Sequence, residues 1–162
     1  MKNVLGLAAM AAVVALGVGA TSAYADSAVG TASVTIVDPV AVSNQRNLSF
    51  GTVAPNATGG TVGVEATDAG TVHPSGVQVL APVTSGHVAI KAASGFLYSA
   101  SVDGTIQLNG PGTLWASLGL DRAGDTGTGN WQDFYVGGTL TLPANTPSGG
   151  YAGNYNVTAN YN

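Results

Sequence analysis

The sequence predicts an all-β protein, built as a β-sandwich of immunoglobulin-like or jelly-roll type. After residue 25, apolar residues recur with a spacing of two, which is typical of half-buried strands. Glycine, proline and asparagine interrupt this alternation about every ten residues, as expected for short strands joined by turns. No segment there combines a helical period with proper caps. Many short strands in one domain favour two packed sheets, and a closed barrel is the alternative arrangement.

The first 25 residues predict a signal peptide. Lys2 precedes an almost unbroken apolar run over 4–20, and Ala23-Tyr24-Ala25 has the small-x-small pattern of a signal peptidase site. We expect the mature chain to start at Asp26 and to be exported to the periplasm, cell surface or outside the cell. A retained anchor is the alternative, but a run of this length is short for a spanning helix and no second run follows. Removing 25 of 162 residues leaves 137, enough for one core.

The candidate strands follow from alternation bounded by turn residues. Asp103-Gly104, between two alternating runs, predicts a two-residue hairpin. The expected strands are Ala32–Val37, Val40–Val42, Asn47–Val53, Thr61–Glu65, Val77–Leu80, His87–Ala92, Leu97–Val102, Gly104–Leu108, Leu114–Leu120, Phe134–Leu142 and Asn154–Tyr161.

The first of these strands, in residues 26–38, is set apart from the rest. Ala28, Ala32, Val34 and Ile36 share one parity, and small hydroxyl residues mostly fill the other. Asp38-Pro39 then interrupts the run before the domain of residues 39–162. The segment either pairs within its own domain or leaves it and adds a strand to a neighbour as a donor strand. The alternation satisfies both arrangements.

The last predicted strand offers an acceptor for such a donor. Tyr155, Val157, Ala159 and Tyr161 share one parity and are expected to line the groove that the donor's apolar side chains fill.

Charge and cysteine content exclude several classes of function. The chain after residue 25 carries three basic residues against eight acidic ones, a net charge of −5. Nucleic acid is not expected as a partner, because binding needs clustered Lys and Arg. The chain has no cysteine, so neither disulfides nor thiol chemistry are available. A surface so poor in charge is weakly protected against strand-to-strand association.

No catalytic constellation is expected, and we predict no enzyme and no cofactor. The two histidines, His73 and His87, lack metal-ligand spacing, and Glu65 with Asp68 is best interpreted as a pair of solvated loop carboxylates.

One loop and one aromatic cluster are weaker candidates for binding. Asp121, Asp125 and Asn130 could supply oxygen ligands to a cation, but the calcium-loop rhythm is missing and Arg122 intervenes. An ordinary loop is the favoured interpretation. The aromatic side chains that follow could stack on a carbohydrate, although aromatic residues at a strand start more often pack in a core or at its rim. They are Trp131, Phe134 and Tyr135.

Two motifs resemble a known family. Leu48-Ser49-Phe50-Gly51 resembles the L-x-F-G element of the exported domain-of-unknown-function family 4402. The V-G-G-x-L run Val136-Gly137-Gly138-Thr139-Leu140 resembles its closing pattern, together with 150–158, which contains Gly150, Tyr151 and Gly153. The resemblance spans about Ala32 to Tyr161.

That family is similar in pattern to archaic chaperone-usher pilins and spore coat U-like proteins. The resemblance implies an incomplete sandwich, a periplasmic chaperone, an outer-membrane usher and head-to-tail polymerisation with homologous subunits. This chain lacks the cysteines that archaic pilins carry near the first strand. We therefore expect a structural subunit of a bacterial surface filament or coat. The alternative is a self-contained secreted binding module for a glycan or surface partner.

Overall fold

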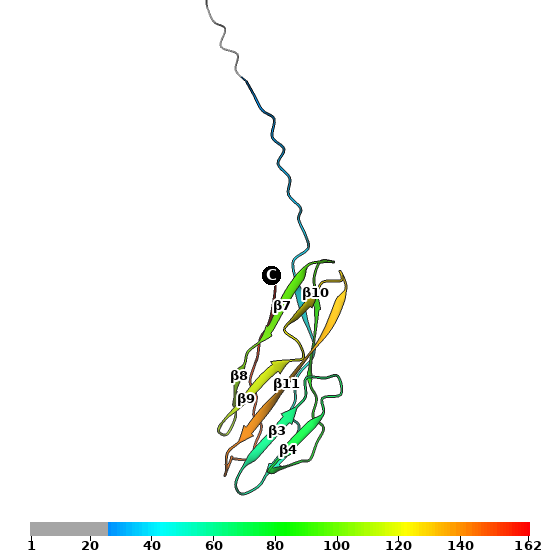
Figure 1. The fold of residues 1–162 in the computed structure, drawn as a ribbon. Coiled ribbons are helices and arrows are strands. Elements are labelled where there is room, and N and C mark those ends of the chain that lie inside the picture. The colour runs from blue at the N-terminus through cyan, green and yellow to red at the C-terminus, as the bar shows by residue number, and fades with distance from the viewer. Residues whose placement is uncertain (1–25) are drawn as a thin grey trace, which may run out of the picture. The chain divides into compact units, whose positions relative to one another are not determined.

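The structure is a computed structural model that describes residues 26–162. Within that range it contains strands and no helix, which confirms the all-β prediction (Figure 1). The strands are β1 (Ala41–Arg46), β2 (Val53–Pro55), β3 (Gly60–Val64), β4 (Val72–Ser75), β5 (Val77–Val79), β6 (Gly86–Lys91), β7 (Leu97–Val102), β8 (Thr105–Asn109), β9 (Thr113–Leu120), β10 (Gly124–Thr126), β11 (Trp131–Leu142) and β12 (Val157–Tyr161).

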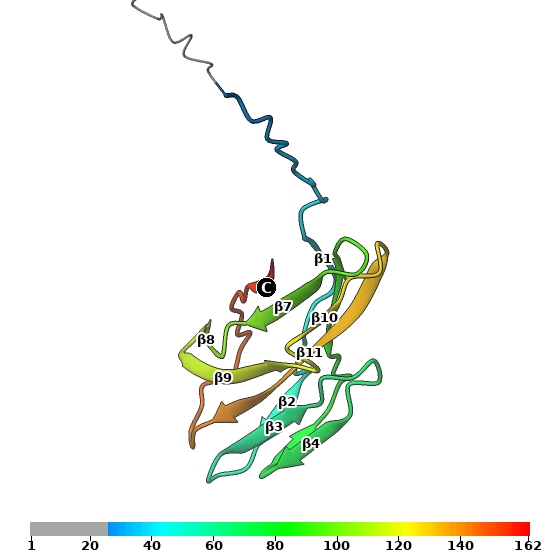
Figure 2. The same cartoon turned by 45° about the horizontal axis from the view of Figure 1, so that its top comes forward.

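The larger sheet is organised around β11, its longest strand. One edge of β11 pairs first with β6 over Trp131–Val136 and then with β3 over Gly138–Leu142. The other edge pairs with β9, which in turn pairs with β8. β1 lies outside β6 and β4 outside β3, and all pairs are antiparallel. Figures 1 and 2 show β3 and β4 side by side next to the β9–β11 pair.

The smaller sheet has the order β10-β7-β12, so β12 pairs with β7 alone. β2 and β5 form a separate two-stranded ladder. Every second side chain of these strands is turned inward, as the period-two pattern predicts, and the sheets enclose two apolar clusters. The β-sandwich prediction is therefore confirmed.

The two clusters lie under different parts of the sheets. One joins β6, β7 and β11 through Ile90, Tyr98 and Phe134, and the inward side chains of β12 pack against it. The other lies under β3, β8, β9 and the end of β11, with Val62, Leu114 and further leucines at its centre.

Several expected strand boundaries were wrong. Asp103-Gly104 is not a hairpin, because β7 and β8 belong to different sheets and the chain crosses between them there. Asp103 instead pairs with the segment before β12, where its main-chain N–H and a carboxylate oxygen both bond Asn156. The run Asn47–Val53 is mostly unpaired, with a single bridge from Ser49 to Thr84. β4 and β10 were not expected at all.

Residues 26–35 belong to a unit separate from Ile36–Asn162. The predicted signal peptide of residues 1–25 lies outside the described residues. Residues 26–35 contain no helix or strand, so the expected strand over Ala32–Val37 is not formed in this single chain. Val34 and Ile36 are 84% and 87% exposed. Among the described residues, no helix is long and apolar enough to cross a membrane.

Candidate functional site

A long groove opens onto the apolar cluster under β3, β8 and β9. Its volume is about 1350 Å³, above the ~300–1,000 Å³ of ordinary small-molecule pockets. One wall comes from the segment 42–55 and the other from 146–157. The floor consists of core side chains: Val88, Leu108, Leu114, Leu140 and Leu142.

The two walls are each tied to the domain on the side away from the groove. In the first wall, Ser49 exchanges two main-chain hydrogen bonds with Thr84, at 2.8 and 2.9 Å. In the second wall, Ala152 exchanges two with Asn109, at 2.8 and 3.0 Å. Within the described part of the chain, no main-chain hydrogen bond joins one wall to the other. The groove therefore lies between two segments of main chain that do not pair with each other.

The motif 48–51 shapes the first wall. Phe50 is buried in the apolar cluster, and Leu48 packs against it from the same face of the chain. Gly51 has a φ of 71°, and a side chain there would meet the main-chain carbonyls of Ala81 and Pro82. A residue other than glycine would be strained at this turn, so the motif anchors the wall at the point where it passes the floor.

The motif 136–140 shapes the floor. Along one edge of β11, the pairing partner changes from β6 to β3 at Gly137. A Cβ atom at Gly137 would collide with the main chain of Val64 and Ala66. Gly138 is equally close to the main chain of β9, at Ser117. Val136 and Leu140, on either side, are buried, and Leu140 lies on the groove floor. The paired glycines thus let one strand serve both halves of the larger sheet.

The motif 150–153 shapes the second wall. A side chain at Gly153 would collide with the main-chain carbonyl of Gln107, whereas Gly150 faces open space. The hydroxyl of Tyr151 donates to the carbonyl of Pro147 at 2.8 Å, which closes the loop at the end of the wall.

The predicted acceptor residues divide into two pairs. Tyr155 and Val157 line the groove, and their role as acceptors of a donor strand stays a prediction. Ala159 and Tyr161 lie beyond it and pack against the cluster around Phe134. Burial raises the pKa of Tyr155, and a main-chain hydrogen bond with Leu48 of the opposite wall partly opposes the rise. The Tyr155 hydroxyl lies close to Gly86, where a Cβ atom would meet it.

The predicted donor residues form no strand among residues 26–162. Ala28, Ala32 and Val34 belong to the segment without strand, and Ile36 is the first residue of the folded unit. Their role as a donor strand stays a prediction.

The loop that was a weak candidate for binding a cation contains an arginine, Arg122, next to the candidate carboxylates. Arg122 lies between the carboxylates of Asp121 and Asp125, at 2.6 and 3.4 Å, and its guanidinium carbon is 3.8 Å from the centre of the Phe134 ring. Asn130 takes part only in contacts with Thr128. No group of three metal-binding side chains occurs in residues 26–162. The arginine supplies the positive charge that these carboxylates need.

The histidines and the aromatic cluster are also separated. His73 bonds Glu65 at 2.7 Å and His87 bonds Asp133 at 2.8 Å, each as an isolated pair. Phe134 is fully buried, Trp131 is half exposed, and Tyr135 stacks on His87. Phe134 therefore packs in the core, as aromatic residues at a strand start more often do, and it does not share a face with Trp131 and Tyr135, because adjacent residues of a strand face opposite sides.

Sequence reasoning identified the second wall but missed the first wall as part of a site. The signal was present: Leu48 and Phe50 alternate like a strand, yet nothing in the sequence supplies an obvious partner for that strand.

Comparison with known proteins agrees with the motifs. A family model described as Domain of unknown function (DUF4402) matches residues 40–161. Neither the curated proteins nor the solved structures contain a match to the chain. The matched region begins at Val40, so it covers both walls and the floor of the groove and leaves out the segment before it.

Proposed function

The chain belongs to the DUF4402 family, and we propose that it is an exported structural subunit of a bacterial surface filament or coat, assembled by strand addition. In this mechanism the segment 26–37 of one subunit enters the groove of the next. The observation that carries the proposal is the groove itself, which opens onto core leucines between two walls that do not pair with each other.

The length of the segment suits the groove. Twelve extended residues span about 40 Å at the ~3.3 Å rise of a strand. The walls run over 42–55 and 146–157, so a strand of this length would lie along most of either wall. A small ligand would leave much of the groove empty.

The chemistry of the segment also suits the groove. Ala28, Ala32, Val34 and Ile36 would face the floor, and the main chain would bond the free groups of the walls. Burying roughly 200–300 Å² of apolar surface would contribute about 5–8 kcal/mol before entropy costs, at ~25 cal/mol/Å². A long-lived link would then rest on slow unfolding as well as on affinity.

An empty groove also accounts for the partners that the family resemblance implies. Before assembly, the two walls, which do not pair with each other, would be open to other exposed strands. A periplasmic chaperone would cover the groove, and an outer-membrane usher would replace the chaperone with the next subunit. Homologous subunits or further copies of this chain are the expected neighbours.

The experiment compares assembly by the chain from Asp26 with assembly by one that starts at Asp38. We expect the longer chain to form polymers that resist mild denaturant and the shorter chain to stay monomeric. A peptide of residues 26–37, added to the shorter chain, should bind one to one and raise its melting temperature. Polymers formed equally well by the shorter chain would contradict the proposal.

Parity provides the matched control. Val34→Asn with Ile36→Asn changes the side chains meant for the floor, and Ser33→Asn with Thr35→Asn changes the opposite face. The first pair should abolish polymers and the second should preserve them. Equal behaviour of the two variants would mean that the segment does not dock as a strand with one apolar face.

The same experiment decides the alternative, a self-contained secreted binding module. The free edge of β1 borders the groove, so a segment that turns back at Pro39 could fill the groove of its own chain. The chain from Asp26 would then be a monomer, and removal of residues 26–37 would destabilise it.

A further inference from the structure

The outer face of the larger sheet carries a continuous polar surface that the groove does not use. Five strands, β4, β3, β11, β9 and β8, lie side by side, and their inward side chains form the core. Two rows of directly opposed residues cross the outer face. The first row is Ser75, Thr61, Thr141, Trp115 and Gln107. The second row is His73, Gly63, Thr139, Ser117 and Thr105.

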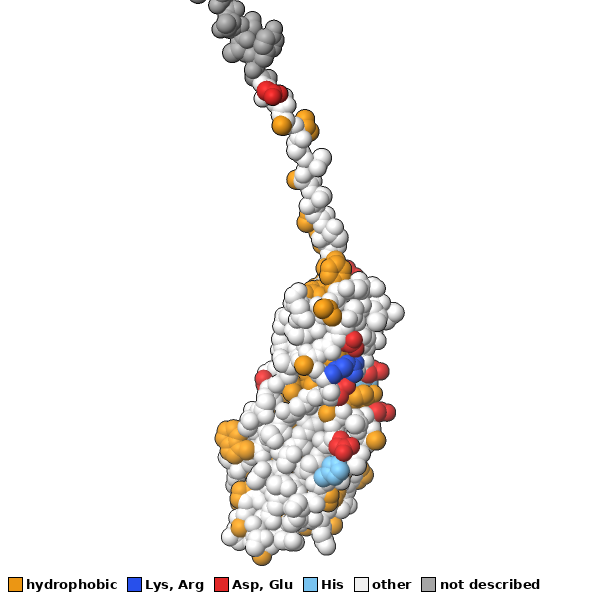
Figure 3. Space-filling view, in the orientation of Figure 1, with side chains coloured by type: hydrophobic (Ala, Val, Ile, Leu, Met, Phe, Trp, Pro, Cys, Tyr) orange, Lys and Arg blue, Asp and Glu red, His pale blue; other side chains and the backbone are white. Residues whose placement is uncertain are grey.

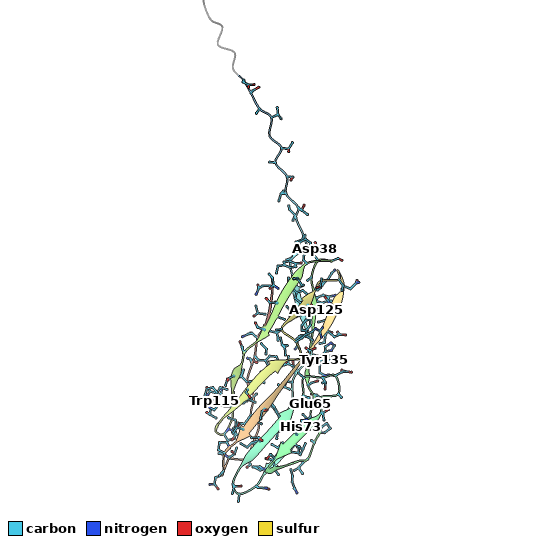
Figure 4. The ribbon with its side chains drawn as sticks, viewed as in Figure 1. Asp38, Glu65, His73, Trp115, Asp125 and Tyr135 are labelled. Carbon is cyan, nitrogen blue, oxygen red and sulfur yellow. The ribbon has the colours of Figure 1, made fainter. Side chains whose placement is uncertain are left out.

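Trp115 is the one aromatic side chain in these rows. It is 54% exposed, and its cross-strand neighbours are Thr141 and Gln107, which offer hydrogen-bonding groups but no apolar cover. Figure 4 shows Trp115 at the margin of the sheet, away from Glu65 and His73. A solvated tryptophan held on a rigid strand loses little entropy when a ligand stacks on it.

A shallow depression of about 460 Å³ lies on the same face, over the second row of residues and one row away from Trp115. It is lined by Gly63, Gly119 and Gly137, of which Gly119 faces open space, and by Ser117 and Thr139, which carry hydroxyls. Ser117 is two residues beyond Trp115 on the same face of β9, about 7 Å along the strand. The depression and the indole face can therefore be covered by one extended ligand.

Glu65 and His73 border the far side of the depression. Their side chains bond each other at 2.7 Å, and this hydrogen bond lowers the pKa of Glu65, so the carboxylate is ionised at neutral pH. A carboxylate and an imidazole offer paired acceptor and donor groups to neighbouring hydroxyls of a ligand. In Figure 3 the surface around this red and pale-blue pair is mostly white, with few charged groups.

We propose that this outer face binds a neutral polysaccharide. The apolar face of a hexose ring would stack on Trp115, because its C–H groups complement the negative face of the indole ring. Hydroxyls of the next ring would bond the groups around the glycine depression. The strands of the face contain no lysine or arginine, and Glu65 borders it, so an acidic polysaccharide would be repelled. The site lies on the opposite side of the sheet from the groove floor and does not depend on filament assembly.

The test uses affinity electrophoresis of the purified protein in gels that contain laminarin, mannan or alginate. The first two are neutral polysaccharides and the third is acidic. We expect retardation by laminarin or mannan and none by alginate. Trp115→Ala should weaken binding about tenfold or more, as for a central aromatic contact. Trp131→Ala is the matched control, because Trp131 is 52% exposed on a different part of the molecule, and it should leave binding unchanged.

A second pair of variants tests the depression and gives a readout apart from affinity. Gly119→Val fills the depression without a clash, since nothing lies within 4 Å of a Cβ atom there, and it should also weaken binding about tenfold. Trp131→Phe leaves Trp115 as the single tryptophan, so its emission should shift on adding laminarin or mannan. The proposal is overturned by the absence of retardation in both neutral gels, by equal loss in Trp115→Ala and Trp131→Ala, or by binding to alginate alone.

Discussion

The hydroxyl of Tyr161 donates a hydrogen bond to the main-chain carbonyl of Asp38 at 2.7 Å, although 123 residues separate the two. The same hydroxyl accepts a hydrogen bond from the main-chain N–H of Ala93, also at 2.7 Å. One phenol thus joins β12, the β6–β7 connection and the point where the proposed donor segment ends. Figure 4 labels Asp38 at this point.

Removing that hydroxyl tests the junction. Tyr161→Phe leaves the Ala93 N–H and the Asp38 carbonyl without their partner, and we expect a loss of about 1 kcal/mol in the free energy of unfolding. Urea denaturation measures it. Tyr135→Phe is the control, because the Tyr135 hydroxyl makes no hydrogen bond among the described residues. Equal effects of the two variants would show that the junction is not stabilising.

The cross-strand pair Gly137 and Gly119 provides a matched comparison of two glycines. Gly137→Ala should cost about 2 kcal/mol or more, because the Cβ atom meets the main chain where β11 exchanges its partner. Gly119→Ala should be neutral or stabilising by up to about 1 kcal/mol, since the site is open and alanine restricts the unfolded chain. Urea denaturation of both variants checks this. A tolerated Gly137→Ala would refute the close approach of β3 and β11.

The second wall of the groove depends on a different glycine. Gly153→Val should displace the wall from Gln107 and reduce polymer formation, because the side chain has no room there. Gly150→Val, three residues away in open space, should assemble normally. Size-exclusion chromatography with light scattering measures polymer mass. Normal assembly by Gly153→Val would mean that this wall does not shape the acceptor.

The arginine between two carboxylates predicts a charge-dependent loss of stability. Arg122→Gln should lower the free energy of unfolding by about 1–3 kcal/mol, because Asp121 and Asp125 lose their shared partner. Lys91→Gln is the control, since Lys91 forms no ion pair within residues 26–162.

Thermal unfolding with and without calcium tests whether the same loop binds a metal ion instead. Calcium should not stabilise the natural chain, and a rise in its melting temperature would contradict the assignment of Arg122 as the resident cation.

The pair Glu65 and His73 predicts a pH dependence with a defined sign. The hydrogen bond to His73 lowers the pKa of Glu65 in the folded state. Its contribution to stability is therefore present above the unfolded pKa of about 4.3 and is lost as the pH falls through the lower folded pKa. Glu65→Gln should lower the stability slightly at pH 7, where the ionised pair contributes, and should flatten the stability profile below pH ~4.3. A profile that keeps its slope in Glu65→Gln would assign the acid sensitivity to other carboxylates.

The alternation of apolar and polar residues predicted which side chains face the core better than it predicted which strands pair with each other. β7 was expected over Leu97–Val102 and lies there, and Leu48 and Phe50 point inward as their parity requires. The run 47–53 nevertheless has no full partner in this chain, and sequence pattern says nothing of a missing strand. β4 was overlooked because of Pro74, which is tolerated since β4 is an edge strand and pairs with β3 alone.

The candidate sites were harder to predict for a related reason. Asp103-Gly104 carries the local signal of a hairpin, but the chain changes sheet there, and only long-range pairing decides that outcome. The groove requires two walls that are about 100 residues apart in sequence, so no local pattern contains it. Trp115 was overlooked because its exposure depends on which face of β9 the core selects.

The place where the donor segment joins the folded domain has a mechanical consequence. If subunits are linked through that segment, tension on the filament enters the domain at Asp38 and continues into β1. β1 is antiparallel to β6 and bonded along its length, so a pull along its axis loads the rungs of the ladder together rather than one after another. The junction would then resist force by shear, and it would do so without any covalent cross-link, in a chain that contains no cysteine.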